Sequence, residues 1–489
     1  MQAPLPVVTV TRKRPRQHER VACDVALASG HETSLERLPS IFAGQFTPAY
    51  LHGQRQLRHG ARNIGTALLL PVYFNRSFFV PLTRAAIPFV ICAWNNEASR
   101  RYPLSKYQRD RSRTVAKSAR VFVFARDAKT SAMLGKRCIM AFSKQIPANP
   151  VVAVAGATGA VGQEFMQVLH DLDFPASKIV PLASARSAGK EIDFEGCGQV
   201  PAGKLVVQEM TPEAFQGIDI ALFSAGAGVS KQMRQAVVDA GAVMIDNSSA
   251  FRMDEDVPLV VPEVNPDDVK WHNGVIANPN CTTIIMSLPL KALHNVAPVT
   301  RVVVSSYQAA SGAGAPAMAE LYDQTREFLD GKRGDELTVS AFAHQIAFNC
   351  IPHIDVFMDD GLTKEEWKMV VETKKIFHAD IAVAPTCVRV PSLRCHAEAV
   401  NVEFAQPISV EQAREALEAF DGVTVMDDPA NNVYPMPGLL QGTNDVYVGR
   451  LRNDPTIENG LNFWCVGDQI RKGAALNAVQ IAQLLLPQA

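Results

Sequence analysis

The sequence predicts an α/β protein in which a doubly wound parallel sheet is joined to a second, α+β domain and preceded by a basic extension. Three observations predict this architecture. A glycine motif separates a short apolar strand from an amphipathic helix just after Pro150. Further apolar strands then alternate with helices across short loops, which is typical of a parallel sheet covered by helices. Longer β-rich segments follow Cys281 and indicate a different second domain.

Charge divides the chain of 489 residues into two unequal parts. Residues 1–149 hold 24 Lys and Arg against 7 Asp and Glu, a net charge of +17, whereas the remainder carries −18. Such asymmetry between segments predicts an arm attached to a normal globular protein. Because the arm shows no sustained helical or strand period, we expect residues 1–147 to be disordered.

Three interpretations of this arm remain open. It resembles an organelle transit sequence in being Arg-rich, Ser-rich and poor in acids, which would place the protein in an organelle such as a plastid rather than the cytoplasm. Its basic blocks also suit nucleic acid, although its aromatic residues form no stacking platform. Finally, translation could begin later, near Met133 or Met140. We favour targeting, then a later start, and expect no nucleic-acid partner.

Composition excludes several classes of protein. No apolar run reaches the ~18 residues that a membrane helix needs, so we expect no membrane partner. The nine cysteines lack paired spacings, so neither a disulfide framework nor a zinc module is indicated and we expect no metal site. With 47% hydrophobic residues, the chain can fill the cores of two or three domains.

The stretch VVAVAGATGAVGQEFMQVLHDL predicts a strand, a glycine turn and a helix. Glycines in this pattern permit a tight turn and a close approach to a pyrophosphate, which then rests on the helix N-terminus. The pattern alone is a weak signal, but here it stands in the structural context that it requires. We therefore predict a Rossmann-type dinucleotide-binding domain over residues 148–281, with a turn formed by Gly156, Thr158, Gly159, Ala160, Val161 and Gly162.

Two later strand ends complete the predicted cofactor site. After KIVPLAS the chain has Ser184, Arg186 and Ser187 where an acid would bind the ribose of NAD. Hydroxyls and a guanidinium suit a 2′-phosphate, which favours NADP; the alternative is a polar loop with one solvated arginine. A further strand, IDIALF, ends at the loop of Ser224, Ala225 and Gly226, which we expect to face the cofactor.

Cys281 stands where the extended segment VIANPN turns into a helix. Unpaired backbone N–H groups and the positive end of the helix macrodipole favour the thiolate at such a place. Cys281 is therefore a candidate nucleophile, the alternative being a small buried apolar residue. Arg252, on the strand-end loop DNSSAFR, is a candidate for binding an anion rather than a plain surface charge.

The second half supplies polar residues of matching chemistry. Gln308 ends a β-rich segment, and Arg389 and His396 belong to two strands predicted around a turn. A histidine beside an arginine, in a chain with a thiolate and a nicotinamide, suits acyl chemistry on an anionic substrate; the alternative is a core histidine. Glu365 and Lys368 lie one turn apart on a predicted helix, where a solvated ion pair is the simpler interpretation.

Residues 150–487 resemble the aspartate-β-semialdehyde dehydrogenase family through GATGAVG, ASARSAGK, DNSSAFR, NPNCTTI, SSYQAASGAG, EEWKM, RVPSLRCHAEAV and DVYVGRLR, all in family order. The resemblance implies NADPH-dependent reduction of L-4-aspartyl phosphate to L-aspartate 4-semialdehyde. This is the second step from aspartate to lysine, threonine and methionine. It also implies a homodimer, with a substrate and dimerisation domain over 282–466. We expect a helix over 467–487 to complete the first domain.

The same resemblance implies roles for individual residues. Cys281 matches the family nucleophile, Gln308 the residue that orients the intermediate, and His396 the acid/base. Relatives usually carry Gly or Ala where Cys395 precedes this histidine.

The substrate contacts also follow from the resemblance. Arg389 matches the clamp on the α-carboxylate, and Glu365 the partner of the α-amine. Arg252 and Lys368 match the phosphate-binding pair, and Asn280 flanks the nucleophile.

Two rival functions are kept open. N-acetyl-γ-glutamyl-phosphate reductase shares the thioester chemistry, but its substrate has an acylated amine, and Glu365 argues for a free ammonium group. A non-catalytic NADP-binding protein with a nucleic-acid-binding arm is the second rival. An intact set of Cys281, Gln308 and His396 argues against it.

Overall fold

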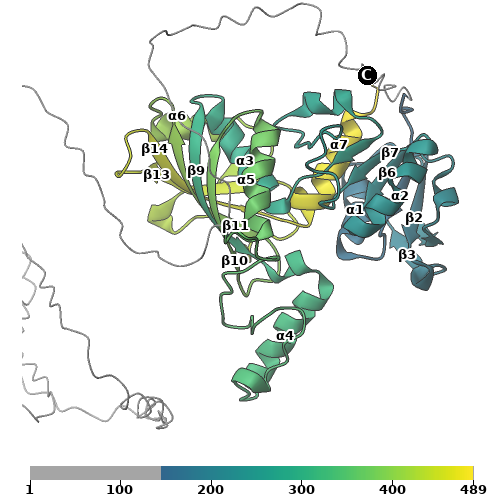
Figure 1. Cartoon of the computed structure of the whole chain (residues 1–489), viewed down its shortest axis with the longest axis horizontal. Helices are drawn as coiled ribbons and strands as arrows, with labels where there is room; N and C mark the ends of the chain where they lie inside the picture. The colour runs from purple at the N-terminus through teal and green to yellow at the C-terminus, as the bar shows by residue number, and fades with distance from the viewer. Residues whose placement is uncertain (1–144, 488–489) are drawn as a thin grey trace, which may run out of the picture. The chain divides into compact units, whose positions relative to one another are not determined.

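The computed structural model describes residues 145–487, which form two six-stranded sheets with their helices and one small hairpin. Figure 1 shows the first sheet in blue and the second in green and yellow. The expectations for the basic extension fall almost wholly on residues 1–144, which lie outside the described residues.

The first sheet is parallel throughout, with the strand order β5-β2-β1-β6-β7-β8, which confirms the doubly wound sheet. Strands β1, β6 and β7 are buried along nearly their whole length, which explains why their sequences are apolar runs rather than alternating patterns. The elements of this region are β1 (Val151–Ala155), α1 (Ala160–Asp171), β2 (Lys178–Ala183), β3 (Glu191–Phe194), β4 (Gly203–Val206), β5 (Gln208–Glu209), β6 (Ile220–Phe223), α2 (Ala227–Asp239), β7 (Val243–Asp246) and β8 (Val275–Ala277).

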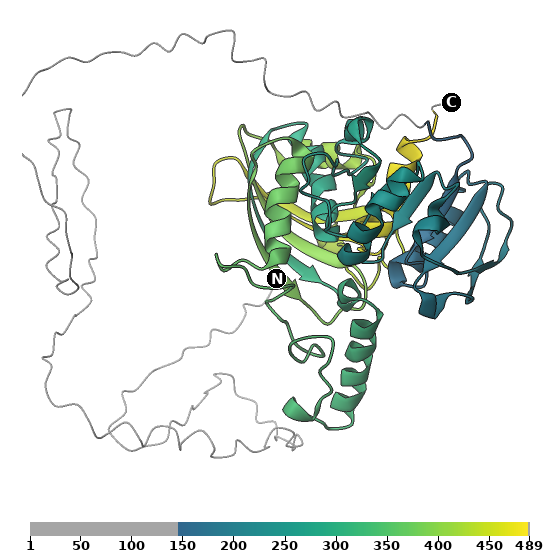
Figure 2. The same cartoon turned by 45° about the vertical axis from the view of Figure 1, so that its right-hand side comes forward.

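The second sheet is mixed, with the order β10-β9-β11-β14-β13-β12. The two strands expected around a turn, β10 and β11, do not pair with each other, because β9 lies between them, parallel to β10 and antiparallel to β11. Helices α3, α5 and α6 contact this sheet (Figures 1 and 2). The elements are α3 (Cys281–His294), β9 (Val299–Gln308), α5 (Lys364–Phe377), β10 (Ala382–Arg389), β11 (His396–Phe404), α6 (Val410–Glu418), β12 (Val423–Val425), β13 (Val446–Asn453) and β14 (Gly460–Gly467).

One segment extends away from both sheets. Helix α4 (Ala315–Leu329) points away from them in Figures 1 and 2. A small apolar cluster that includes Ala310, Leu321 and Ile351 packs at its base. The remaining short helical turns are η3 (Ala185–Ser187), η4 (Pro212–Phe215), η5 (Pro266–Trp271), η6 (Ala310–Ala313), η7 (Gly334–Glu336) and η8 (Pro429–Asn431).

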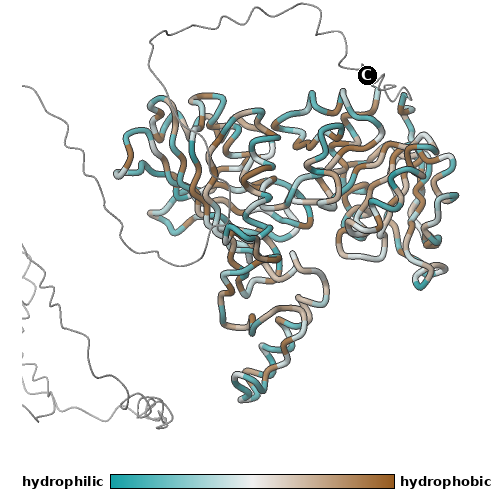
Figure 3. The backbone as a smooth tube through the Cα atoms, viewed as in Figure 1, coloured by the Kyte–Doolittle hydropathy of each residue, from teal (hydrophilic) through white to brown (hydrophobic). Residues whose placement is uncertain are grey.

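Helix α3 joins the two sheets in one core. Its residues Ile284 to Leu290 are buried around the whole circumference. The apolar cluster to which they belong reaches from Phe223 in β6 to Val304 in β9. Figure 3 shows brown, hydrophobic stretches of backbone in the interior of both regions. The helix that begins at Cys281 therefore lies in the interior, where the two halves of the chain meet.

The C-terminal helix differs from the expectation of one amphipathic helix over 467–487. A π-helical turn, η9 (Arg471–Ala475), comes first, and α7 (Leu476–Leu484) follows. The side chain of Asp468 accepts bonds from the N–H groups of Ile470 and Arg471, and its carbonyl accepts the N–H of Gly473 at 3.0 Å, which widens the first turn. Helix α7 is buried on most sides and packs in a second core cluster with β1 and α1.

The division of the chain at residues 281 and 466 stays a prediction. None of the helices in residues 145–487 has the length and hydropathy needed to cross a membrane.

Candidate active site

The glycine turn is built for close backbone packing. Gly156 has a φ of +88°, and a Cβ there would lie 2.3 Å from the carbonyl oxygen of Ser224. A Cβ on Gly162 would lie 2.1 Å from the carbonyl oxygen of Gly156. No side chain caps α1 at Gly159, so the N–H groups of its first turn point to a space that a phosphate can fill. The predicted residues from Gly156 to Gly162 and from Ser224 to Gly226 thus meet at one edge of the sheet.

The predicted 2′-phosphate loop is only partly open. Ser184 and Arg186 are exposed at the end of β2, whereas Ser187 is buried, 6% exposed. The N–H of Ser187 donates to the carbonyl of Ser184 at 2.8 Å and closes a 3₁₀ turn. Ser187 therefore shapes the turn, and Ser184 and Arg186 are the two side chains that a ligand can reach.

Cys281 is the first residue of α3, and Asn280 caps the helix. The side chain of Asn280 accepts the N–H groups of Thr282 and Thr283 at 3.0 and 3.2 Å. Asn280 itself is held by two carboxylates of α5: its Nδ2 donates to Glu365 at 2.8 Å, and its N–H donates to Glu372 at 2.7 Å. The loop that carries the thiol is therefore fixed from both sides.

The thiol does not meet the expectation of a thiolate favoured by the helix N-terminus. Burial first, and then the Glu365 carboxylate, raise the pKa of Cys281 to about 11. The Thr282 hydroxyl, Arg252 and Lys368 lower this pKa, but not enough to offset the other two. Sequence reasoning missed this because it could not reveal how deeply the thiol is buried, nor that the Glu365 carboxylate lies near it.

Arg389, Gln308 and His396 form one row across three adjacent strands. Arg389 pairs with Gln308, and Ala397 pairs with Tyr307, so His396 lies beside Gln308. All three members of the row are buried. Such a row presents side chains to one face of the sheet, here the face that α3 and α5 cover.

Hydrogen bonds connect this row to the nucleophile. Gln308 Nε2 donates to the hydroxyl of Thr282 at 2.8 Å, and this hydroxyl lies 4.0 Å from the sulfur of Cys281. Arg389 donates to the carbonyl of Ala309 at 2.7 Å. The structure thus brings together residues that are more than 100 positions apart.

His396 is a neutral imidazole with a defined proton position. Its Nδ1 accepts the N–H of Ala309 at 3.1 Å, so the ring proton belongs on Nε2. Burial, and then the charge of Arg389, hold the pKa of His396 well below 6.5. Nε2 is buried and has no hydrogen-bond partner among residues 145–487, so its N–H is available to a ligand.

The backbone before His396 is strained and tied to the first domain. Cys395 has a φ of +70° and is fully buried, a conformation in which glycine costs less than any other residue. Its N–H donates to Gln469 at 2.8 Å, while Arg394 bridges Asp468 and Glu164 of α1. These contacts hold the segment before His396 against the C-terminal segment and α1.

Glu365 and Lys368 form a buried ion pair rather than a solvated one. Lys368 Nζ lies 3.0 Å from Glu365 and 2.8 Å from Asp355. Burial opposes ionisation of Glu365, but Lys368 and then Asn280 hold its pKa below the usual value. Burial likewise opposes the charge of Lys368, and Glu365 raises its pKa.

Arg252 reaches the same loop from the first sheet. Its Nη1 donates to Glu372 at 3.0 Å and its Nη2 to the carbonyl of Asn247 at 2.7 Å. Its Nε is buried without a partner among the described residues. The eight residues predicted for catalysis and substrate binding therefore belong to one connected region.

Family comparisons agree with this arrangement. A family model described as "Semialdehyde dehydrogenase, NAD binding domain" matches residues 151–272, and one described as "Semialdehyde dehydrogenase, dimerisation domain" matches residues 290–472. An aspartate-semialdehyde dehydrogenase of Aquifex aeolicus is 51% identical over 341 residues, which cover 69% of this chain and 98% of the relative. The chain belongs to the aspartate-semialdehyde dehydrogenase family.

Solved structures of the family resemble the chain closely. The aspartate semialdehyde dehydrogenase II of Vibrio cholerae, complexed with ASA, is 45% identical, with a TM-score of 0.66, and covers 69% of this chain and 98% of its own. The enzyme of Candida albicans with NADP is 25% identical, with a TM-score of 0.52, over 69% of this chain and 98% of its own. Family membership decides against the reductase of the acylated substrate that the sequence left open.

Three residues of this aspartate-semialdehyde dehydrogenase site were missed from the sequence. A Cβ on Gly312 would lie 2.9 Å from Arg389 and 3.2 Å from His396, and a Cβ on Gly473 would lie 2.8 Å from the Cβ of Cys281. No local pattern reveals such glycines, because the neighbours come from distant segments. Glu372 was detectable, since it follows Glu365 by two turns on the predicted helix.

Proposed function

We propose that this chain interconverts L-4-aspartyl phosphate and L-aspartate 4-semialdehyde through a thioester on Cys281, as the second step from aspartate to lysine, threonine and methionine. The observation that carries the proposal is the position of Cys281 at the start of α3, connected through Thr282 to Gln308 in the row that contains His396. A thioester divides one difficult reaction into two easier steps.

The nucleophile is activated when substrate binds. The ammonium group of aspartyl phosphate pairs with Glu365, which removes the negative charge that raises the pKa of the Cys281 thiol. Arg252 and Lys368, which favour the thiolate, then oppose burial alone rather than burial and a carboxylate together. The thiolate attacks the acyl carbon, the bond to phosphate oxygen breaks, and inorganic phosphate leaves.

His396 and Gln308 act on the intermediate. The proton on His396 Nε2 is available to the oxygen that gains negative charge, which supports a role for this histidine as donor and acid in the reductive direction. Gln308 Nε2 is shared between Thr282 and Glu365, at 2.8 and 3.3 Å, so its amide orientation is fixed relative to the thiol.

The charged residues divide the substrate between them. Arg389 binds the α-carboxylate, since it is buried beside His396 and uses one Nη for Ala309. Arg252 and Lys368 bind the phosphate, and Arg252 Nε supplies a free donor. Lys368 is already paired with Asp355, so phosphate must compete with that carboxylate.

The strand, glycine turn and helix from β1 to α1 support a dinucleotide site, because this arrangement lets a pyrophosphate approach the backbone at the start of the helix. When bound, NADPH supplies hydride to the thioester carbon. Ser184 and Arg186 would hold the 2′-phosphate. An Arg186→Ala variant should lose about tenfold in the ratio of kcat/KM for NADP over NAD, and an unchanged ratio would contradict this assignment.

The central test is a cysteine substitution. Cys281→Ala should abolish phosphate-dependent oxidation of the semialdehyde, by about 10⁴-fold or more, while NADP binding measured by calorimetry stays unchanged. Cys350→Ala is the matched control, because this cysteine is exposed and its side chain takes part in none of the contacts described above. Rapid quenching followed by mass spectrometry should detect the acyl group on Cys281. Turnover retained by Cys281→Ala would end the thioester proposal.

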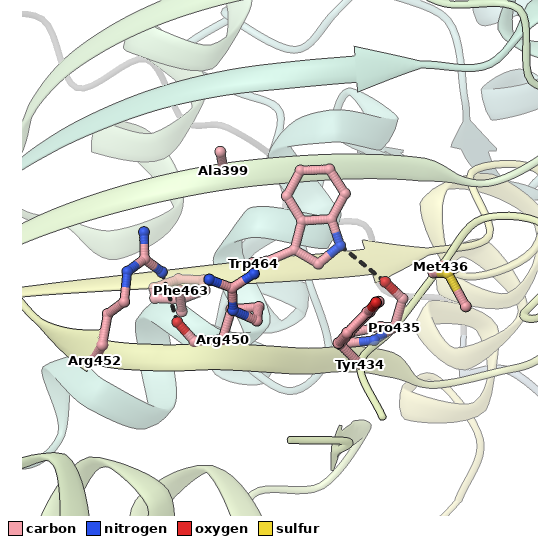
Figure 4. Close-up of a pocket in the computed structure, with 8 residues that line it drawn as sticks. All are labelled: Ala399, Tyr434, Pro435, Met436, Arg450, Arg452, Phe463 and Trp464. Atoms are coloured by element: carbon pink, nitrogen blue, oxygen red, sulfur yellow. Dashed lines mark hydrogen bonds between the residues drawn. The ribbon is translucent and has the colours of Figure 1, made fainter. Parts of the chain in front are cut away.

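We also propose a homodimer formed through the outer face of the second sheet. The residues of the dimerisation-domain match include Tyr307 and Trp464, whose rings lie 5.3 Å apart on this face. Figure 4 shows Trp464 donating to the carbonyl of Pro435, at 2.9 Å, beside a hollow of about 280 Å³ bordered by Arg450 and Arg452.

Light scattering on purified protein tests the dimer. Trp464→Asp should shift the mass towards one chain, whereas Trp271→Asp, on η5, should not. A wild-type monomer at micromolar concentration would contradict the proposal.

The proposed localisation concerns the basic extension. Residues 1–147 fused to a fluorescent reporter should direct it to plastids in a plant cell. A diffuse cytosolic signal would favour a later start of translation, and a nucleic-acid mobility shift with the extension alone would favour the binding tail.

A further inference from the structure

Helix α5 presents two buried glutamates to the loop of the nucleophile. Glu365 and Glu372 are seven residues apart, two turns along one face, and are 6% and 1% exposed. Both contact Asn280: Glu365 accepts its side-chain Nδ2, and Glu372 accepts its backbone N–H at 2.7 Å. The family resemblance assigned a role to Glu365 alone, so Glu372 is a buried carboxylate without a function.

The second oxygen of Glu372 binds the guanidinium of Arg252. Oε1 accepts Nη1 at 3.0 Å, while Oε2 accepts the N–H of Asn280. Each oxygen thus has its own donor. The guanidinium is also held by the carbonyl of Asn247, so two of its three nitrogens are fixed and Nε remains.

Charge explains why this carboxylate is retained in the interior. An arginine that is 7% exposed needs a counterion, because an unpaired buried charge is strongly unfavourable. Burial raises the pKa of Glu372, and Arg252 lowers it part of the way back. In the contacts above, the carboxylate of Glu372 accepts from the Arg252 guanidinium and from the Asn280 N–H and donates to no group. This is the arrangement expected of an ionised carboxylate.

We propose that Glu372 is a positioning residue that fixes the anion-binding Arg252 relative to Asn280, and therefore relative to the thiol of Cys281. One rigid carboxylate sets both the guanidinium and the peptide from which α3 begins. The inference rests on the proposed function, because Arg252 must bind the phosphate of the substrate. Glu372 touches no reacting atom and acts through the other two residues.

Glu372→Gln separates this role from a structural one. The glutamine keeps the shape but offers an NH₂ group to one of the two donors, so one contact becomes donor against donor. We expect the KM for phosphate in semialdehyde oxidation to rise at least about tenfold, while the KM for semialdehyde changes less than about threefold. Glu372→Asp, which keeps the charge, should recover part of the loss.

Glu366→Gln is the matched control. Glu366 is a neighbouring buried carboxylate of the same helix, and it accepts two backbone N–H groups, those of Thr363 and Cys387, at 2.7 and 2.9 Å. Its substitution also removes a buried charge from α5, but it has no contact with Arg252 or Asn280. The KM for phosphate should therefore stay at the wild-type value, whatever happens to the melting temperature.

A double-mutant cycle with Arg252→Gln decides the matter. If Glu372 acts through Arg252, Glu372→Gln should add less than about twofold to the KM for phosphate in that background. Additive effects, or a Glu372→Gln variant with a normal phosphate KM, would overturn the inference and leave the proposed function intact.

An unchanged phosphate KM in Arg252→Gln would overturn both the role of Arg252 and this inference. Absence of phosphate-dependent turnover in the wild type would instead refute the proposed function. NADP binding checks that each variant is folded.

Discussion

The two sheets form their proposed sites in different ways, one from backbone and the other from side chains. In the first sheet the proposed cofactor site is formed by backbone at strand ends, and Gly156, Gly159 and Gly162 lie within seven residues of one another. In the second sheet the proposed catalytic site is formed by side chains in a row across neighbouring strands, where Arg389, Gln308 and His396 come from three separate segments. A local motif therefore identifies the first site, whereas only the strand order assembles the second.

A second row of buried side chains crosses the same sheet beside the row of Arg389, Gln308 and His396. Cys387, Ser306, Glu398 and Cys465 occupy four adjacent strands and are all fully buried. They lie one repeat further along each strand than the functional row, on the same face. The row contains acids and thiols but no hydrogen bond to either oxygen of Glu398 from the described residues. The buried polar side chains of this sheet thus extend beyond the predicted site residues.

The largest effect is expected from substituting His396 in the row of Arg389, Gln308 and His396. His396→Ala should lower kcat by about 10²–10⁴-fold, because the donor at Nε2 is lost. His396→Gln should retain at least about tenfold more activity than the alanine variant, since an amide can donate from a similar position. Steady-state rates of semialdehyde oxidation compare the two, and equal losses would argue against a donor role.

The pH profile of kcat/KM tests the protonation state of His396. Because burial and Arg389 lower the pKa of His396, protonation occurs only as the pH falls well below 6.5. The profile of kcat/KM should therefore show no inflection near 6.5 that depends on His396. An inflection there in the wild type, absent in His396→Gln, would show that the ring titrates normally.

The next largest effect is expected from substituting a glycine in the turn between β1 and α1. Gly162→Ala places a Cβ 2.1 Å from the carbonyl oxygen of Gly156, so backbone must move. The dissociation constant for NADP should rise by about 10- to 100-fold, and stability should fall by about 1–3 kcal/mol. Gly228→Ala is the matched control, because nothing lies within 4 Å of a Cβ there. Equal cofactor affinity in the two variants would contradict the close-packed turn.

The same contrast explains what the sequence could predict. The parallel sheet, the cofactor turn and the helix beginning at Cys281 follow from local patterns, and the structure confirms these elements. The raised pKa of the Cys281 thiol was not predicted, because it depends first on burial in the folded core and then on Glu365, 84 positions away. The π-helical turn at Arg471–Ala475 was missed because the side chain and carbonyl of Asp468 both redirect the backbone there.

A smaller effect concerns Glu398 in the second row. Burial raises the pKa of this carboxyl well above 4.5, so the folded protein holds a proton that the unfolded chain releases. Stability from this group is therefore present below about pH 4.5 and is lost as the pH rises towards the raised pKa. Glu398→Met should gain about 1–2 kcal/mol in the free energy of unfolding at pH 8 and less at pH 5.

Denaturant titrations at both pH values measure the change. Glu403→Met, at a half-exposed position on the same strand, should show no comparable gain. A Glu398→Met variant that loses stability at pH 8 would show that the buried carboxyl has partners or a structural role beyond those described.

The smallest effect is expected from removing residues 1–139, which lie outside the described residues. The apolar core of the first sheet includes Ile146, 6% exposed, in one cluster with Val152 and Phe165. A chain that begins at Met140 keeps this contact and every residue of both sites, so its kcat and melting temperature should match those of the full chain. A chain that begins at Ala148 loses the isoleucine and should be less stable by about 1.5–3 kcal/mol. The pair of truncations therefore locates where the folded protein begins. Loss of activity or solubility in the chain that starts at Met140 would show that residues before it take part in one of the two sheets.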